Sequence, residues 1–483
     1  MDPLSPVVGF DLDMTLVDTR ARIAASLRRT LAEVGVAVTE DDVWPWIGPP
    51  LVDALTALAP GHELEPLVAR YRYLHDVPEA PPVTALGGAA EALAAVRRAG
   101  GRTVVVSAKA AGAVRLVLEQ AGLAELVDRT EGGLFAEQKA EVLLEEGAQV
   151  YVGDHPGDVL AARAARAVAV VVPTGPHDER VLTAAGADVV LPDLAAFAGW
   201  FDTYVLDQRL DALRGELVGL GSVLVAFSGG ADSALVLHAA VQALGTDKVV
   251  AATAVSPSLA DGELEAAAAL ARSLGVRHLT PATAEMDREG YARNAADRCY
   301  YCKSELLETL GPLAEELGLE HVLTGTNADD ARAGFRPGIR AAAERGARTP
   351  LLDAGLTKAQ VREASRRAGL RTWDKPAAAC LSSRVAYGVQ ITPSRLARVD
   401  GAERALRSAL AEAGIEVANL RVRDLGDDAA RVEVDPEAVP AVAKNGRMLD
   451  AVRAAGFAEV DVDPRGFRSG SMNELLADPD EYR

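Results

Sequence analysis

Short aliphatic runs alternate with helical patterns along most of the chain. The runs that begin at Val7, Arg102, Val150, Val223 and Lys248 are rich in valine and bounded by turn residues, as is typical of buried strands. Strands that alternate with helices predict a mostly parallel, doubly wound sheet. The predicted fold class is therefore α/β, with ligands bound at the carboxyl ends of the strands.

Two stretches depart from this alternation. Residues 18 to about 85 show the amphipathic pattern of helices with no strand between them, as in residues 20–31. Near the C-terminus a helix is expected to begin after Thr392, a suitable N-cap, and alternating segments at Leu420 and Arg431 predict a pair of strands. The expected divisions are residues 1–200, 205–385 and a small α+β region at 386–483.

Length and charge restrict the possible partners. The chain has 483 residues, 49% of them hydrophobic, and a formal net charge of −20. This balance is typical of a globular protein and works against a large nucleic-acid footprint, which needs clustered basic residues. The first residues do not resemble a signal peptide, and no apolar run approaches the length of a membrane span. A cytoplasmic protein is expected, with neither a membrane nor a nucleic-acid partner; homo-oligomers are left open.

The strand at Val223 runs into a glycine-containing loop, Ser228-Gly229-Gly230-Ala231-Asp232-Ser233, and a helix is expected to follow at once. The glycines let the backbone approach a ligand closely, and N–H groups at a helix N-terminus bind phosphates. The loop lacks the lysine of a Walker A motif, so it does not predict hydrolysis at a γ-phosphate. The alternative is an ordinary turn after a buried strand.

This loop resembles the PP-loop of ATP pyrophosphatases, which adenylate an acceptor and release pyrophosphate. The resemblance implies an ATP site with bound Mg²⁺. The ATP-binding residues it implies are Ser228, Gly229, Gly230, Asp232 and Ser233.

A second set of polar residues follows the strands of the first 200 residues. Two carboxylates, Asp11 and Asp13, share one face at the end of the first strand. One can attack phosphorus while the other exchanges a proton with the leaving group. A hydroxyl, a cation and a further acidic pair complete a set suited to phosphoryl transfer: Ser107, Lys139, Asp154 and Asp158.

In order and type these residues resemble the four motifs of the haloacid dehalogenase-like (HAD) phosphatases. The resemblance implies that Asp11 is the nucleophile and Asp13 the general acid/base, that residues 18–85 form a helical cap, and that Mg²⁺ is bound. Ser107 and Lys139 would hold the phosphoryl oxygens, and the implied Mg²⁺ residues are Asp11, Asp13, Asp154 and Asp158. Met14 departs from the family, which commonly has glycine there, and is expected to crowd the loop. The alternative is a non-catalytic docking or gating domain.

All three cysteines of the chain, Cys299, Cys302 and Cys380, have basic neighbours in the sequence, which predicts thiolates. Three thiolates are one ligand short of a four-cysteine site. Two arrangements remain open from the residues: a cluster with one open iron, or a redox pair with a separate sulfur carrier.

Together the motifs resemble the LarE family of ATP-dependent sulfur transferases from about residue 208 to 475. The segments that carry the resemblance are the PP-loop, Arg298–Lys303, Gly325–Asp330, Arg336–Gly338, Asp374–Gly388 and the tail Gly466–Asn473. Family members convert carboxylates of pyridinium-3,5-dicarboxylate mononucleotide to thiocarboxylates, on the way to a nickel-pincer nucleotide. One branch sacrifices the sulfur of a single cysteine that matches Cys380. A branch with all three cysteines carries a 4Fe-4S cluster, which is the cofactor implied here.

Arg421 and Arg423 alternate on one expected strand face, where paired guanidinium groups suit phosphate or carboxylate. From the residues alone, an edge strand with a solvated charged face is preferred. The resemblance favours substrate binding instead, and the residues it implies are Ser383, Arg384, Glu403, Arg421, Arg423 and Glu433.

The prediction is thus a sulfur transferase that acts on a small nucleotide and requires a sulfide source. It is fused to a HAD phosphatase whose substrate the sequence does not indicate. A PP-loop tRNA thiolase and an amide-forming ligase are the alternatives. The acidic balance argues against the first, and the cysteines would be unnecessary for the second.

Overall fold

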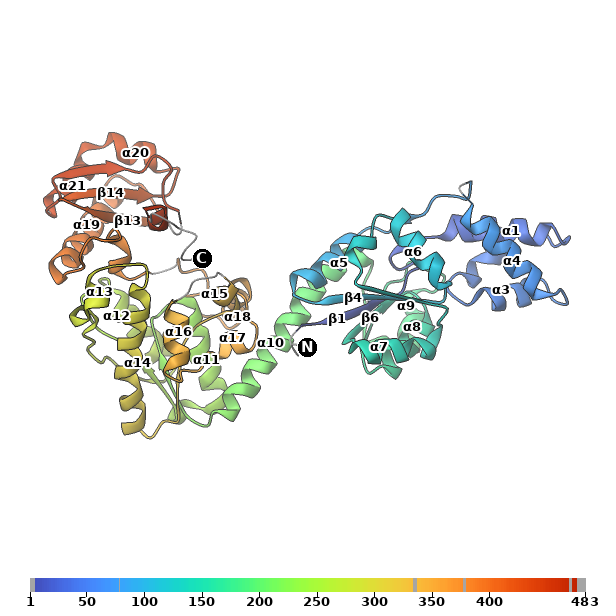
Figure 1. Cartoon of the computed structure of the whole chain (residues 1–483), viewed down its shortest axis with the longest axis horizontal. Helices are drawn as coiled ribbons and strands as arrows, with labels where there is room; N and C mark the ends of the chain where they lie inside the picture. The colour runs from blue at the N-terminus through green and yellow to red at the C-terminus, as the bar shows by residue number, and fades with distance from the viewer. Residues whose placement is uncertain (1–4, 78, 333–336, 377–378, 469–470, 476–483) are drawn as a thin grey trace. The chain divides into compact units, whose positions relative to one another are not determined.

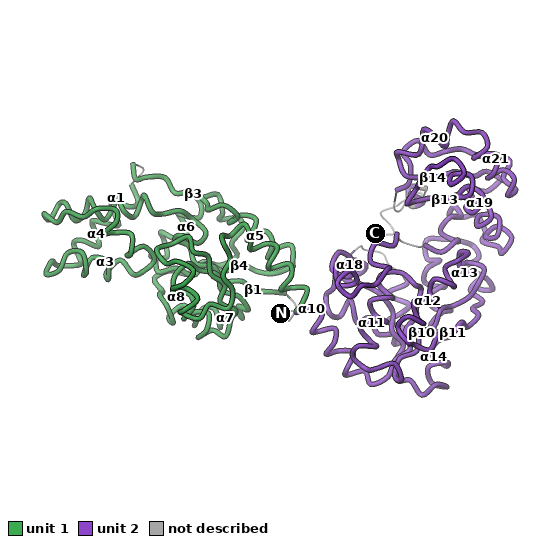
Figure 2. The backbone as a smooth tube through the Cα atoms, turned by 180° about the vertical axis from the view of Figure 1, so that it is seen from behind, with its two compact units in different colours: residues 1–207 green, residues 208–483 purple. Residues whose placement is uncertain are grey.

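The computed structural model of the chain describes residues 5–475 apart from 78, 333–336, 377–378 and 469–470. Backbone contacts divide the chain into two compact units, Met1–Asp207 (unit 1) and Gln208–Arg483 (unit 2), coloured separately in Figure 2. The point of division falls inside helix α10 (Phe197–Gly219). Among the described helices, none has both the length and the apolar composition needed to cross a membrane. The further boundary expected at about residue 385 stays a prediction.

Unit 1 is built on a six-stranded parallel sheet with the strand order β5-β4-β1-β6-β7-β8. Its central strands β4, β1 and β6 are labelled in Figure 1. Its strands are β1 (Val7–Phe10), β4 (Arg102–Ser107), β5 (Arg129–Gly132), β6 (Val150–Gly153), β7 (Val168–Val171) and β8 (Val189–Val190). In register, Phe10 lies beside Val105 of β4 and Val152 of β6. The carboxyl ends of these three strands therefore meet at one edge, as the parallel α/β prediction requires.

Alternate residues of these strands enter two hydrophobic clusters on opposite faces of the sheet. Val105 packs with α5, α6 and the first half of α10, whereas Val104 and Val106 pack with α7, α8 and α9. Burial on both faces explains why the strands are runs of valine rather than alternating patterns. The covering helices are α5 (Ala89–Arg98), α6 (Ala111–Gln120), α7 (Lys139–Glu146), α8 (Pro156–Ala164) and α9 (Glu179–Ala185), with short 3-10 turns η2 (Ala124–Leu126), η3 (Ala136–Gln138) and η4 (Leu194–Ala196).

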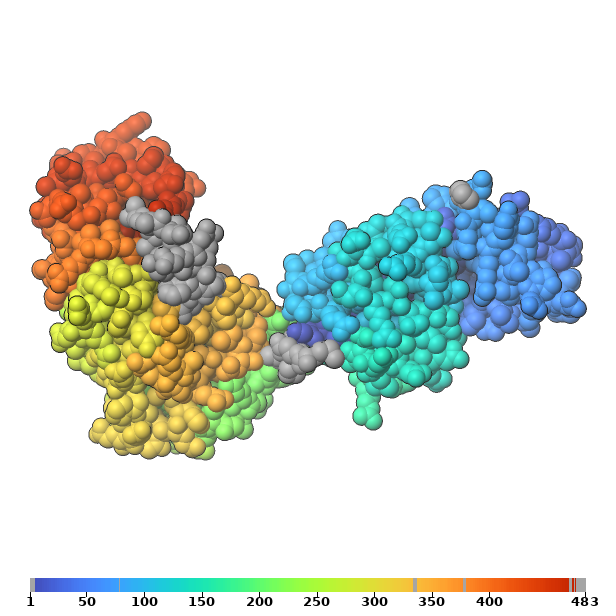
Figure 3. Space-filling view, in the orientation of Figure 1, coloured from blue at the N-terminus to red at the C-terminus, as the bar shows by residue number. Residues whose placement is uncertain are grey.

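Between β1 and β4 the chain forms a helical lobe with its own hydrophobic cluster, here called the cap (blue in Figure 3). Its helices are α1 (Arg20–Ala32), α2 (Glu40–Val43), η1 (Trp44–Trp46), α3 (Leu51–Leu58) and α4 (Leu64–Asp76). The chain enters and leaves the cap through an antiparallel pair of short strands, β2 (Val17–Asp18) and β3 (Thr84–Ala85). The amphipathic pattern of residues 20–31 thus forms a helix as predicted.

Unit 2 contains a four-stranded parallel sheet with the order β11-β10-β9-β12. Its strands are β9 (Val223–Ala226), β10 (Val249–Ala252), β11 (Arg277–Leu279) and β12 (His321–Leu323). Because β9 lies between β10 and β12, the loop that follows β9 opens at the centre of the sheet edge. The helices around this sheet are α11 (Ala231–Leu244), α12 (Glu263–Ser273), α13 (Glu289–Ala292), α14 (Arg298–Glu316), α15 (Ala328–Arg332), α16 (Pro337–Glu344), α17 (Pro350–Asp353) and α18 (Lys358–Arg367), with η5 (Thr246–Lys248), η6 (Glu285–Asp287) and η7 (Leu381–Arg384).

The C-terminal part of unit 2 is a three-stranded sheet covered by helices. Strands β13 (Leu420–Gly426) and β14 (Ala429–Val434) are antiparallel, as the alternating segments predict, and β15 (Glu459–Val462) is parallel to β14. The remaining helices are α19 (Pro393–Glu412), α20 (Val439–Lys444), α21 (Gly446–Ala454) and η8 (Ser471–Leu475). The Thr392 hydroxyl accepts a hydrogen bond from Arg395 N, so the predicted N-cap is confirmed. One hydrophobic cluster joins this part to Tyr291 and Leu381, and so ties the segment after Cys380 to the C-terminal sheet.

Candidate active sites

In unit 1 the Lys139 ammonium group binds several of the residues predicted at the strand ends. Its Nζ donates hydrogen bonds to Asp11 Oδ1 at 2.7 Å, to Asp158 Oδ1 at 2.7 Å and to the Tyr151 hydroxyl at 2.9 Å. All four side chains are buried, where charge-assisted hydrogen bonds are strong. Lys139 therefore fixes two carboxylates that lie far apart in the sequence, Asp11 and Asp158.

Ser107 and Asp154 lie on either side of Asp11, at the ends of β4 and β6. Ser107 Oγ accepts a hydrogen bond from Lys109 N at 3.2 Å, and Asp154 Oδ1 accepts one from the Thr15 hydroxyl at 2.8 Å. The structure thus brings Asp11, Ser107 and Asp154 to one sheet edge, as their positions in the sequence predict.

The carboxylates of Asp11, Asp154 and Asp158 suit a divalent cation. One oxygen from each lies within 4.8 Å of the others. Asp154 Oδ2 is fully buried and has no hydrogen-bond partner among the described residues, a costly state unless a cation or a proton meets it. Carboxylate oxygens are ligands that Mg²⁺ prefers. These residues therefore fit Mg²⁺, whereas the fourth predicted ligand, Asp13, is not part of this group.

Burial and the neighbouring charges also shift the pKa values of the acids and of the lysine in this site. Burial raises the pKa of Asp11 to about 7; Lys139 lowers it, and Asp158 raises it further. Burial, followed by repulsion from Asp11 and Asp158, also raises the pKa of Asp154. For Lys139 burial works to lower the pKa, but the two carboxylates outweigh it and raise the pKa. Added positive charge would relieve the repulsion among these acids.

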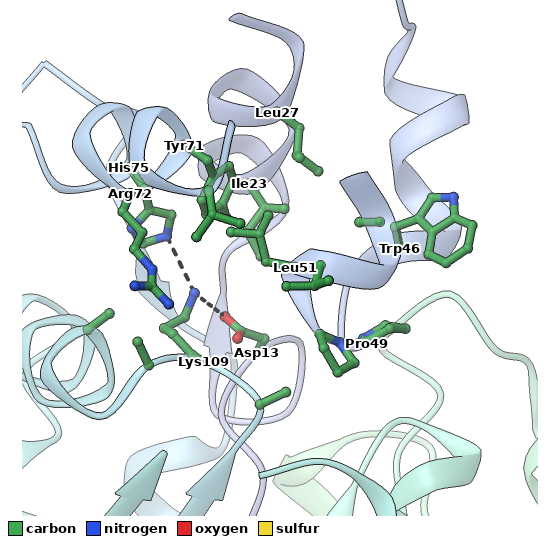
Figure 4. Close-up of a pocket in the computed structure, with 18 of the residues that line it drawn as sticks. Asp13, Ile23, Leu27, Trp46, Pro49, Leu51, Tyr71, Arg72, His75 and Lys109 are labelled. Carbon is green, nitrogen blue, oxygen red and sulfur yellow. Dashed lines mark hydrogen bonds and ion pairs between the residues drawn. The ribbon is translucent and has the colours of Figure 1, made fainter. Parts of the chain in front are cut away.

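Asp13 faces the cap instead of this group (Figure 4). Its Oδ1 forms an ion pair with Lys109 Nζ at 3.3 Å, and that Nζ lies 3.4 Å from His75 Nε2 in the cap. His75 Nδ1 lies 2.9 Å from Asp76 Oδ1. Burial and Lys109 lower the pKa of His75, so the ring is neutral; Nδ1 then carries the proton toward Asp76 and Nε2 accepts from Lys109.

A pocket of about 400 Å³ opens above Asp13, between the cap helices and the loop after β4. Asp13, Lys109, His75 and Arg72 gather at one end of it, and apolar side chains, Trp46 among them, line the other (Figure 4). The Lys109 and His75 pair was not anticipated from the sequence. The available signal was the position of Lys109, two residues beyond Ser107 at the same strand end.

Met14 adopts a left-handed backbone conformation with φ of 59°, which glycine adopts more readily. Its N–H donates to Val17 O at 2.9 Å, and the Thr174 hydroxyl donates to its carbonyl oxygen. The side chain packs into the hydrophobic cluster of the cap. The expected crowding of the loop is therefore not seen, because the side chain has a place in that cluster.

In unit 2 the loop after β9 has the geometry of a phosphate cradle. Gly229 has φ of 69°, and an added Cβ would lie 3.3 Å from Ala267 Cβ, so both conformation and space favour glycine. Ser233 Oγ lies 3.1 Å from Ser228 Oγ and accepts a hydrogen bond from Ser228 N at 3.3 Å. Helix α11 begins at Ala231, so its N-terminal N–H groups lie at the loop.

Two lysines contact this loop from later parts of the chain. Lys358 Nζ lies 2.6 Å from Asp232 Oδ2, whose other oxygen accepts from Asn327 Nδ2 at 3.2 Å. Lys375 Nζ donates to Gly229 O at 3.2 Å and to Glu263 Oε2 at 2.7 Å. Neither lysine was assigned to the ATP site from the sequence. They place positive charge beside a loop that has none of its own.

A cavity of about 520 Å³ joins the loop to the cysteines and to the C-terminal part. Ser228 and Lys375 line it beside Cys302 and Cys380, and Arg384 and Arg421 line it as well. Among the residues that the structure describes, these come from four separate stretches of the chain. One residue of the predicted ATP loop, two of the three cysteines and part of the predicted substrate set therefore line the same cavity.

The three cysteines differ in their surroundings. Cys299 and Cys380 are exposed, and Cys302 is partly buried. Burial raises the pKa of Cys302, as do Cys380, Glu285 and Cys299, and Lys303 offsets this only in part. The expectation of a thiolate at Cys302 is thus wrong for the protein without a bound group, because burial outweighs the basic neighbour. The sulfurs do not all lie within 4.8 Å of one another, which argues against a single ion and not against a larger cluster, whose irons are bound separately.

Comparison with known proteins matches each unit separately. The NAD synthase family model matches residues 206–296. Pyridinium-3,5-bisthiocarboxylic acid mononucleotide synthase of Lactiplantibacillus plantarum is 37% identical over 56% of this chain and 96% of its own length. The chain belongs to the LarE family. An uncharacterised protein of Synechocystis is 42% identical to the LarE-type unit, unit 2, over 56% of this chain and 99% of its own length.

Unit 1 precedes this LarE-type unit and belongs to the haloacid dehalogenase-like hydrolases. The family model of that description matches residues 8–172. Phosphoglycolate phosphatase of Agrobacterium fabrum is 33% identical over 40% of this chain and 91% of its own length. A haloacid dehalogenase-like family hydrolase of Streptococcus pneumoniae, 18% identical, gives a TM-score of 0.38 and covers 41% of this chain and 99% of that one.

In the LarE-type unit two of the arginines predicted to bind substrate, Arg384 and Arg423, form ion pairs with Glu403 and Glu433. Arg384 donates to Glu403 Oε1 at 3.0 Å and to Cys380 O at 3.0 Å, so it ties the cysteine loop to α19. Arg421 lies 5.3 Å from the centre of the Phe467 ring; burial and the nearby Arg384 lower its pKa to about 10. Arg384, Glu403 and Arg421 all line the cavity.

Arg423, Glu433 and Ser383 are not among the cavity-lining residues. Arg423 Nη2 lies 2.7 Å from Glu433 Oε2, and Arg423 Nη1 donates to Ser383 O at 3.1 Å. Arg421 and Arg423 are only 7% and 5% exposed, which rules out the solvated strand face. The Arg423–Glu433 ion pair instead lies behind the cavity, where Arg423 binds the carbonyl of Ser383 next to the cavity-lining Arg384. Arg336, Ala377 and Ala378, which belong to the predicted motifs, lie outside the described residues.

Proposed function

We propose that the chain is a bifunctional enzyme, an ATP-dependent sulfur transferase preceded by a phosphatase. The observation that carries the first activity is the 520 Å³ cavity, which is lined by Ser228 of the PP-loop, two cysteines and two buried arginines. An adenylation site beside thiols is the arrangement that sulfur transfer to an activated carboxylate requires. The LarE family membership supports the same reading.

The proposed acceptor is the dicarboxylate nucleotide whose bisthiocarboxylic acid form is named for the Lactiplantibacillus plantarum relative. A carboxylate oxygen of the acceptor attacks the α-phosphorus of ATP, and the bond to the pyrophosphate oxygen breaks. Backbone N–H groups at the start of α11 bind the departing pyrophosphate, and Lys375 adds positive charge there. AMP then leaves when sulfur attacks the acyl carbon.

Arg421 and Arg384 orient the acceptor in this scheme. A guanidinium group suits phosphate and carboxylate because it donates two parallel hydrogen bonds. Glu403 holds Arg384 through Nε, and Arg423 with Glu433 supports the neighbouring strand. The charges of the acceptor are thereby met by side chains that are already fixed in place.

Cys299, Cys302 and Cys380 fit a 4Fe-4S cluster with one iron left open, since the chain has three thiol ligands and no fourth. Cys302 and Cys380 line the cavity, and the charge of Cys299 acts on Cys302. When bound, the cluster supplies the added sulfide that replaces oxygen in the acceptor. Arg384 holds the Cys380 carbonyl and so positions this ligand. A sulfide source outside the chain is required.

Replacement of Cys380 separates this activity from the alternatives. Cys380→Ala protein is expected to release pyrophosphate from ATP and the dicarboxylate nucleotide but to form no thiocarboxylate. Ser408→Ala, an exposed change on α19, is the control and is expected to behave as wild type. An amide-forming ligase would keep its full activity in Cys380→Ala protein, and a tRNA thiolase would require tRNA as the acceptor.

The second proposed activity rests on Lys139, which holds Asp11 and Asp158 in one buried site. Asp11 attacks the phosphorus of a phosphate monoester with its free oxygen, and Asp13 protonates the leaving oxygen. Water then hydrolyses the aspartyl phosphate, with Asp13 accepting the proton. Ser107 and Lys139 bind the phosphoryl oxygens. Asp11, Asp154 and Asp158 would hold Mg²⁺, which neutralises phosphate charge when bound.

Asp11→Asn protein tests this activity. Phosphate release from a panel of phosphate esters is expected to fall at least about 1000-fold, because an amide cannot replace the carboxylate nucleophile. Asp53→Asn, an exposed change in the cap, is expected to leave it intact. Equal activity of Asp11→Asn and wild type would make unit 1 the non-catalytic module.

A further inference from the structure

The pocket between the cap and the core of unit 1 has two chemically different ends (Figure 4). At one end Lys109 lies between Asp13 and His75, with the exposed Arg72 beside them. Two cations next to the proposed general acid suit the phosphate end of a substrate. A phosphate group of a substrate therefore fits at this end of the pocket, beside Asp13.

The other end is apolar and larger than a small acid needs. The side chains that line it are Ile23, Leu27, Trp46 and Leu51 (Figure 4). Tyr71 lies between the two ends, with its ring 5.5 Å from the His75 ring. Tyr71 and Ile23 are buried in the cap cluster yet face the pocket, so the surface is preformed. A pocket of about 400 Å³ lies in the range that binds ring-containing ligands. A two-carbon acid such as phosphoglycolate would leave most of this apolar surface uncovered.

We propose that the phosphatase site acts on nucleoside 5′-monophosphates with an uncharged base, with AMP as its substrate on this chain. The inference rests on the proposed phosphatase function and names its substrate class. The adenine ring covers the apolar end while the 5′-phosphate reaches the cations near Asp13. In the reaction, Asp11 forms a bond to phosphorus, the bond from phosphorus to the 5′ oxygen breaks, and Asp13 protonates that oxygen to give adenosine.

The chemistry of unit 2 supplies this substrate. The proposed sulfur transfer releases one AMP for each carboxylate converted, so a phosphatase on the same chain would remove a product. The pyridinium mononucleotide is also a phosphate monoester, but its ring carries a positive charge and two acidic groups. Burying those charges against leucine and isoleucine without partners would be costly. The pocket therefore distinguishes AMP from the acceptor that the other unit needs.

The test measures phosphate release by the full-length protein with Mg²⁺, from AMP and from phosphoglycolate. Wild type is expected to have a kcat/KM for AMP at least about tenfold above that for phosphoglycolate. Leu51→Asp places a carboxylate at the first turn of α3, where a helix N-terminus tolerates it, and inside the apolar end. It is expected to raise KM for AMP about tenfold and to change KM for phosphoglycolate less than about twofold.

Val34→Asp is the matched control, since Val34 is an exposed cap residue that does not line the pocket. It is expected to leave both KM values unchanged. If the protein prefers phosphoglycolate to AMP and Asp11→Asn abolishes that hydrolysis, AMP is not the substrate, but the proposed phosphatase activity is upheld. No Asp11-dependent hydrolysis of either ester would overturn both. Equal effects of Leu51→Asp on the two substrates would show that the apolar end does not hold the base.

Discussion

At the scale of single residues, the two sites depend on side chains whose charge or backbone is unusual for their position. Lys139 is a fully enclosed cation that holds two acids, and its loss would leave them unpaired in a buried site. Met14 keeps a left-handed backbone without being glycine. In both cases contacts around the residue hold it in place.

Replacement of Met14 by glycine tests which of two effects is larger. Glycine removes a backbone cost of about 1–2 kcal/mol but also removes a buried side chain worth about 2–5 kcal/mol. We expect Met14→Gly to lower the stability of unit 1 by about 1–3 kcal/mol. Urea unfolding followed by tryptophan fluorescence measures this, since Trp44 and Trp46 lie in the cap. A more stable variant would mean that the backbone cost dominates.

At the scale of elements, the polar residues at the ends of parallel strands were predictable from the sequence. Asp11, Ser107 and Asp154 follow β1, β4 and β6, and a parallel sheet brings such ends together. His75 and Lys358 were not predictable, because each comes from a helix far away in the sequence that only packing brings to its site. The sequence predicts a low pKa for Cys302, but burial raises it, and the sequence does not show that Cys302 is buried.

An acid pair between α10 and α17 makes the stability of unit 2 depend on pH. Burial raises the pKa of Glu216 to about 7, with Asp353 adding to the shift. A carboxyl group whose pKa is raised on folding favours the folded state most at pH values below its ordinary pKa of 4.5, where it is protonated. This contribution to the free energy of unfolding is lost as the pH rises through about 7.

Glu216→Gln is therefore expected to be more stable than wild type at pH 8, with a smaller difference at pH 5. Hydrogen exchange of the amides of α17 and of α10 near residue 216 reports this change. Glu315→Gln, an exposed change on α14, serves as the control. A difference that is the same at both pH values would contradict the account.

At the scale of the whole molecule, the chain carries two sets of reacting groups in two compact units. The three carboxylates that fit Mg²⁺ all belong to unit 1, and every residue that lines the 520 Å³ cavity belongs to unit 2. Asp11→Asn is expected to leave thiocarboxylate formation unchanged, and Cys380→Ala to leave phosphate release unchanged. Mass spectrometry of the nucleotide product and a phosphate assay measure the two activities in the same sample.

The central claim is ATP-dependent sulfur transfer at the cavity of unit 2. It is tested most directly by incubating anaerobically reconstituted protein with ATP, Mg²⁺, a sulfide source and pyridinium-3,5-dicarboxylate mononucleotide, and by measuring the mass of the nucleotide product. The account predicts the exchange of oxygen for sulfur at the carboxylates, with pyrophosphate and AMP formed in step. An unchanged nucleotide, with no pyrophosphate released by wild-type protein carrying its cluster, would contradict it.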